Sequence, residues 1–135
     1  MASIHMEILL TKTPAELWDV VRDVGQVHTR FAPGFVVDVA LEDGARTVTF
    51  GNGMVAREVI VAVDEARRRL AYSVRREGLD HHNASFHVLP EGDGARLTWT
   101  ADVLPDAAAV RVREMMTAGL AAVGRALGAR QTEPA

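Results

Sequence analysis

Apolar and polar positions alternate at the start of the chain. The apolar residues recur at every second position, at Ile4, Met6, Ile8 and Leu10. Because successive side chains of a strand point to opposite faces, this period predicts a half-buried strand over residues 3–11.

A helix is predicted directly after this strand. Thr13 is a preferred N-cap residue, Pro14 suits the first helical position, and Glu16 completes a Thr-x-x-Glu capping box. The apolar residues that follow at helical spacing are Leu17, Val20, Val21 and Val24. Gly25 then provides a stop signal. Residues 26–33 have a mixed pattern that predicts a second short helix or a turn.

Six further segments of apolar or alternating residues follow, and turn sequences separate them. Turns such as Asp43-Gly44 and Gly51-Asn52-Gly53 tolerate the positive φ that hairpins need. The predicted strands cover 35–41, 46–50, 54–63, 69–75, 80–89 and 96–104. Because strands joined by hairpins run antiparallel, we expect one antiparallel sheet of about seven strands.

Helical spacing replaces the alternation after Pro105. The apolar stripe consists of Val112, Met116, Gly119, Leu120, Val123 and Leu127. The predicted helix runs for about 22 residues, or about 33 Å, and ends at Gly128. We expect residues 129–135 to form a flexible tail.

This C-terminal helix is the one apolar element long enough to cover the concave face of a bent sheet, so the predicted fold class is α+β. Gly119 adds no side chain to the covered face, and Met115 and Met116 adapt to irregular neighbours. The stripe therefore favours a cavity beneath the helix. A fully packed core is the alternative that the residue types leave open.

Composition narrows the possible functions. The chain has 135 residues, a length that fits a single domain over 1–135. It carries a formal net charge of −3 and contains no cysteine. The absence of cysteine excludes disulfides and thiolate chemistry, and the net negative charge argues against a nucleic-acid partner. No apolar run approaches the ~18 residues of a membrane span, and no signal-peptide pattern opens the chain. We therefore expect a cytoplasmic protein without a metal or cofactor.

Several motifs carry a family resemblance: Thr13-Pro14-Ala15-Glu16-Leu17-Trp18, the segments 57–64 and 69–74, and His82-Asn83-Ala84-Ser85. Together with the order of elements, they resemble the helix-grip fold of the START-like or SRPBCC superfamily, and in detail its polyketide cyclase/dehydrase-like branch. The resemblance covers nearly the whole chain. It implies two short helices after the first strand and a curved sheet that wraps around the last helix.

For the predicted strand 54–63, the residues and the family resemblance disagree about which of its two faces is buried. Arg57 shares its face with valines, so hydrophobicity alone predicts that the arginine's face is buried. The resemblance implies the opposite, since in related plant hormone receptors the glutamate aligned with Glu58 faces the cavity. An inward Glu58 needs a partner, which an arginine on a neighbouring strand would supply as a salt bridge. Without such a partner, burial would strengthen its carboxylate as a proton acceptor.

His82 and Tyr72 alternate in step with the apolar residues of their strands. They therefore share the apolar face, which predicts that both side chains point inward. A neutral imidazole in an apolar cavity can transfer a proton near neutral pH, and a tyrosine hydroxyl can bind a ligand carbonyl. A hydrogen-bonded histidine near a strand end and plain packing of the tyrosine are the alternatives. Glu58, His82 and Tyr72 are therefore the candidate catalytic residues.

The other candidate site residues are expected to form the walls of the cavity. The exception is His28, which lies in the short-helix region, and in related proteins this region caps the mouth of the cavity. These candidates are Trp18, His28, Phe86, Trp99, Met115, Met116, Gly119 and Leu120. Core packing is the alternative role for the large apolar residues, and a solvated position is the alternative for His28.

Three functions fit this pattern. The first is binding of a small hydrophobic or aromatic molecule. The second is a cofactor-independent polyketide cyclase/dehydratase in which His82 or Glu58 removes an α-proton and Tyr72 binds the enolate. The third is a protein-interaction domain with a packed core and an exposed apolar patch. The first two expect a cavity of at least about 300 Å³, and a homodimer is compatible with all three.

Overall fold

The structure is a computed structural model that describes residues 2–130. Its strands are β1 (Ala2–Leu10), β2 (Val36–Glu42), β3 (Ala45–Phe50), β4 (Val55–Asp64), β5 (Arg69–Arg75), β6 (His81–Glu91) and β7 (Gly94–Leu104). Its helical segments are α1 (Pro14–Val21), the π-helix η1 (Val27–Phe31), the 3₁₀ turn η2 (Asp106–Ala108) and α2 (Ala109–Leu127). The order of elements predicted from the sequence is therefore confirmed.

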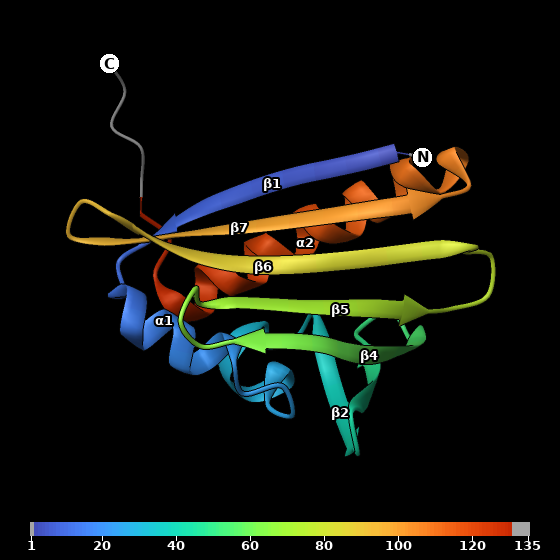
Figure 1. Ribbon diagram of the computed structural model, residues 1–135, viewed down its shortest axis with the longest axis horizontal. Coiled ribbons are helices and arrows are strands. Elements are labelled where there is room, and N and C mark those ends of the chain that lie inside the picture. The colour runs from blue at the N-terminus through green and yellow to red at the C-terminus, as the bar shows by residue number, and fades with distance from the viewer. Residues whose placement is uncertain (1, 131–135) are drawn as a thin grey trace.

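The seven strands form one antiparallel sheet in the order β1-β7-β6-β5-β4-β3-β2. Hairpins connect β2 through β7 in sequence, and β1 joins the sheet beside β7. The sheet is curved, and α2 lies across its concave side (Figure 1). Within the sheet, α2 packs mainly against β1, and it also contacts η1.

The first helix begins as predicted and ends earlier than predicted. Thr13 Oγ1 accepts a hydrogen bond from the Glu16 backbone at 3.1 Å, and Glu16 Oε1 accepts one from the Thr13 backbone at 3.0 Å. The capping box is therefore present. The helix stops well before Gly25, so the prediction that this glycine ends it is wrong. The chain leaves the helix ahead of Val24, whose carbonyl oxygen is bonded by Arg46 from the sheet.

The end of the described chain is held against β1. Ala129 pairs with Leu10, and the backbone N–H of Arg130 donates to the carbonyl of Leu9 at 2.8 Å. Backbone hydrogen bonds thus hold the first two residues of the segment for which we predicted a flexible tail. The rest of the predicted tail, 131–135, lies outside the described residues.

The β4 strand resolves the choice between Arg57 and Glu58. Arg57 is exposed, whereas Glu58 is 7% exposed and faces the concave side. A register shift between Ile60 and Ala62 inserts Val61 as an extra residue, and such a bulge interrupts the alternation of the faces. Val55 and Val61, which alternate in step with Arg57, are 53% and 63% exposed. Hydrophobicity alone favoured the wrong face because these valines lie on the exposed side of the sheet, while the buried face carries the charged Glu58.

Glu58 forms a buried ion pair with Arg46, which lies directly opposite it on β3. Arg46 Nε donates to Glu58 Oε1 at 2.8 Å, and Arg46 Nη1 donates to the Val24 carbonyl at 3.1 Å. The guanidinium also lies 5.3 Å from the centre of the Tyr72 ring. These are the two buried charged residues in the described part of the chain. Removing one of them leaves the other as an uncompensated charge in a medium of low dielectric constant.

We therefore expect strong coupling between Arg46 and Glu58 in folding. Arg46→Met or Glu58→Leu alone should lower the free energy of unfolding by about 3–5 kcal/mol, because each leaves one buried charge unpaired. The double variant should be more stable than either single variant, as urea unfolding would measure. Single losses that simply add up in the double variant would contradict this account of the pair.

Candidate functional site

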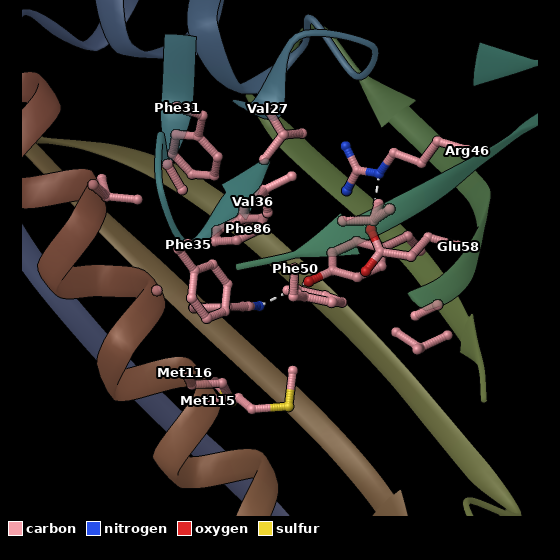
Figure 2. Close-up of a pocket in the computed structure, with 18 of the residues that line it drawn as sticks. Val27, Phe31, Phe35, Val36, Arg46, Phe50, Glu58, Phe86, Met115 and Met116 are labelled. Atoms are coloured by element: carbon pink, nitrogen blue, oxygen red, sulfur yellow. Dashed lines mark hydrogen bonds and ion pairs between the residues drawn. The ribbon is translucent and has the colours of Figure 1, made fainter. Parts of the chain in front are cut away.

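A cavity of about 70 Å³ lies between the concave face of the sheet and α2. Most of its lining is apolar and comes from α1, η1, α2 and the sheet. The polar side chains that line it are Arg46, Glu58, Tyr72, Arg76 and His82. Figure 2 shows Arg46 and Glu58 on the sheet wall, across the cavity from Met115 and Met116 of α2. The arrangement therefore places polar groups on the sheet side and apolar groups on the helix side.

Stacked aromatic rings occupy much of the space beneath α2. Phe86 lies at the centre, 4.7 Å from the Trp99 ring, 5.1 Å from Phe31 and 6.0 Å from Tyr72. Trp99 Nε1 donates a hydrogen bond to Tyr72 Oη at 3.0 Å, which holds both rings in place. The cavity is therefore much smaller than the volume of at least about 300 Å³ that the two ligand-binding functions led us to expect. The alternation of strand positions predicted which side chains point inward, but it did not predict how much of the interior their rings fill.

Gly119 allows two of these rings to pack directly on the backbone of α2. A Cβ atom at this position would lie 2.9 Å from Trp99 Cζ3 and 3.1 Å from Phe35 Cε2. The sequence suggested that a missing side chain here would leave a gap. The structure corrects this prediction, because the rings of Trp99 and Phe35 take up the space.

A wider groove of about 840 Å³ adjoins the cavity. Phe35, Phe50, Arg76 and Met115 line both spaces, so these four side chains form the boundary between them. The rings of Phe35 and Phe50 meet edge to face with their centres 5.3 Å apart. We call these four residues the mouth of the cavity. Figure 2 shows Phe35 and Phe50 close together between the sheet wall and α2.

His82 enters the cavity from the start of β6. Its Nδ1 atom is buried and has no hydrogen-bond partner within the described residues. The pKa of the imidazole is lowered from 6.5 to about 4, chiefly by burial and to a smaller extent by the charges of Arg76 and His81. The ring is therefore neutral at neutral pH, and its Nδ1 atom is available to a polar group of a ligand.

Tyr72 is fully enclosed at the centre of β5. Burial raises the pKa of its phenol, and the nearby carboxylate of Glu58 adds to this effect, while Arg46 and the hydrogen bond from Trp99 oppose it. The phenol therefore stays protonated across the physiological range. Because its oxygen accepts from Trp99, its own hydrogen can be donated to a ligand.

The structure brings most of the predicted site residues to one cavity. Those that line it are Glu58, Tyr72, His82, Phe86, Trp99, Met115, Met116 and Gly119, whereas Trp18, His28 and Leu120 do not. The indole of Trp18 donates to Glu65 Oε2 at 2.8 Å and attaches α1 to the turn after β4. Leu120 is buried in the core, and His28 lies on η1 with its Nδ1 buried and unpaired.

Sequence reasoning missed the residues of the mouth other than Met115, and it missed Arg46. Arg46 has the same parity as Val48 and Phe50 on its strand, so alternation was a signal that could have found it. Arg76 follows the last residue of β5, where alternation no longer applies.

The described residues contain neither a cluster of three metal-ligating side chains nor a helix that could cross a membrane. For metal ions, this means that no three His, Asp or Glu side chains in the described residues are grouped so that they could hold one. For the membrane, none of the helices in residues 2–130 is both long and apolar enough to cross it.

Comparison with solved structures shows the same fold in other proteins. XoxI from Bacillus cereus is 14% identical, with a TM-score of 0.82 over 94% of this chain and 96% of its own. A protein from Thermobifida fusca is 23% identical, with a TM-score of 0.74 over 98% and 100%. A point mutant of norcoclaurine synthase from Thalictrum flavum, in complex with a transition-state analogue, is 22% identical, with a TM-score of 0.67 over 93% and 90%. These likenesses confirm the helix-grip fold, and at such identities they establish the fold alone.

Comparison at the level of sequence identifies a family. No curated protein matches the chain significantly. The family described as polyketide cyclase / dehydrase and lipid transport matches residues 1–129. Because this match covers nearly the whole length, the chain belongs to the polyketide cyclase/dehydrase and lipid transport family.

Proposed function

We propose that this protein binds a small hydrophobic or aromatic molecule between its sheet and α2. The observation that supports this most is an apolar cavity that has polar side chains on one wall, among them His82 with its unpaired Nδ1, and that adjoins a groove. Apolar walls remove ligand surface from water, and a few polar groups orient the molecule. His82 Nδ1 and the Tyr72 hydroxyl are the groups placed for that second role.

The volume of the cavity limits how such a ligand sits. About 70 Å³ accepts a small apolar group but not a whole ligand, since ligand sites usually measure about 300–1,000 Å³. The apolar end therefore enters the cavity, and the rest lies in the groove beyond Phe35 and Phe50. A small cavity is also what a packed interaction domain would have, but the adjoining groove favours a ligand.

A polyketide cyclase or dehydratase is the second candidate, because Glu58 and His82 line the same cavity. Two observations make binding the stronger proposal. An imidazole whose pKa is about 4 is a weak proton acceptor, and Oε1 of Glu58 already accepts a hydrogen bond from Arg46. Turnover of a model poly-β-ketone that persists in both His82→Ala and Glu58→Gln would remove these residues from any such mechanism.

The binding proposal is tested with N-phenyl-1-naphthylamine, an uncharged fluorescent probe. In a Trp18→Phe background, Trp99 is the remaining tryptophan, and it lines the cavity. We expect saturable binding that increases probe fluorescence and quenches Trp99 emission, because the probe approaches the stacked rings.

A matched pair of variants on β4 locates this binding. Ala56 is buried and lines the cavity, whereas Ala62 is exposed on the same strand. Ala56→Leu should weaken probe binding at least about tenfold by filling the cavity, while Ala62→Leu should leave it unchanged. Absence of saturable binding in the parent protein, or equal binding by both variants, would contradict the proposal.

The buried position of His82 also predicts a pH dependence of stability. The folded state lowers the pKa of the imidazole from 6.5 to about 4, so the unfolded chain binds the proton more tightly. Stability is then complete above pH 6.5 and falls as the pH drops toward 4. Between pH 7.5 and 5, we expect a loss of at most about 2 kcal/mol, measured by urea unfolding.

His82→Gln should remove most of this loss, whereas His5→Gln, at an exposed position on β1, should retain it. The carboxylates of Asp64 and Glu65, whose pKa values are lowered by hydrogen bonds, lose their stabilising effect only below this window. The same pH dependence in the His82→Gln variant would show that this imidazole is not the responsible group.

A further inference from the structure

Arg76 lies at the mouth, where it lines both the cavity and the groove. It follows the last residue of β5 and is only partly exposed. Its Nη1 atom is 3.6 Å from Sδ of Met54 and 3.5 Å from Sδ of Met115. Thioether sulfur is a weak hydrogen-bond acceptor, so these contacts do not neutralise the guanidinium.

Among the described residues, six of the other arginines have a carboxylate partner. Arg22, Arg30, Arg46, Arg57, Arg67 and Arg96 each form an ion pair with an aspartate or glutamate. Arg76 has no carboxylate within 4 Å in residues 2–130. It is therefore a partly desolvated cation at the entrance of an apolar cavity, and an anionic partner would compensate its charge.

The other charged residues of the groove do not supply that partner. Arg111, Glu77 and Glu114 line the groove and are exposed, and neither glutamate pairs with Arg76. Their charges are screened by solvent, whereas Arg76 stands at the boundary with the cavity. The charge of Arg76 also reaches inward, since it contributes to the lowered pKa of His82.

From this geometry we propose that Arg76 binds the anionic group of the ligand, so that the protein selects hydrophobic molecules with one carboxylate or sulfonate. This inference rests on the proposed function, because it assumes that the apolar end occupies the cavity. The anionic end then lies at the mouth, where the planar guanidinium can donate two hydrogen bonds to the two oxygens. Met54 and Met115, which now contact Arg76, can move aside because their side chains are flexible.

The test compares two probes that share one ring system. 8-Anilinonaphthalene-1-sulfonate carries a sulfonate, and N-phenyl-1-naphthylamine is the same skeleton without it. Arg76→Met should weaken binding of the sulfonate probe about tenfold or more and change binding of the neutral probe little. Arg75→Met is the matched control, because Arg75 precedes Arg76, is exposed and lines neither space.

The outcomes separate this inference from the proposed function. If the neutral probe does not bind the parent protein, the proposed function fails. If it binds, but Arg76→Met affects both probes equally, Arg76 shapes the mouth without recognising charge and the inference is overturned. An equal loss of sulfonate binding in Arg75→Met would also overturn it, because net charge alone would then explain the effect.

Discussion

The buried ion pair between Arg46 and Glu58 constrains the rest of the structure. A charged pair on the concave face is tolerated only if each partner satisfies the other. Arg46 does so through Glu58, and it also bonds the Val24 carbonyl and lies over the Tyr72 ring. One side chain thus connects the two strands of a hairpin, the segment after α1 and the centre of the sheet. The inward direction of Glu58 follows from this pairing.

The aromatic cluster depends on the same arrangement. Tyr72, whose ring lies against the guanidinium of Arg46, accepts the indole hydrogen bond of Trp99, and Phe86 stacks on both rings. Trp99 in turn contacts α2 at Gly119, where no side chain intervenes. The helix therefore rests on rings along part of the sheet and leaves a small space beside the ion pair. That space is apolar toward α2 and polar toward the sheet, which suits a hydrophobic ligand with few polar groups.

Sequence patterns predicted the elements well because most of them are local. Thr13 and Glu16 form their capping box within one turn, and alternation placed Tyr72 and His82 on the concave side. The inward face of β4 could not be chosen in this way, since valines lie on its exposed face and the buried face carries Glu58, whose partner Arg46 is on another strand. There the family resemblance gave the correct direction for Glu58.

The site was only partly predictable, because its shape depends on contacts between distant segments. Arg76 lies beyond a strand end, so no period indicated its direction, and the volume left by the packed rings depends on rotamers that parity does not specify. Trp18 fell on the apolar side of α1, yet its indole is used to bond Glu65 and does not reach the cavity. Long-range partners of this kind leave no local signal in the sequence.

The central claim is that the apolar end of a ligand enters the cavity between the sheet and α2, next to the aromatic cluster. The two tryptophan indole N–H groups are separate reporters of this claim, because Trp99 donates inside the aromatic cluster, whereas Trp18 of α1 donates to Glu65 in the turn after β4. In a ¹H–¹⁵N correlation spectrum titrated with N-phenyl-1-naphthylamine, the account predicts that the Trp99 indole signal shifts while the Trp18 signal stays in place. A shift of Trp18 alone, or of neither indole while the probe binds, would contradict it.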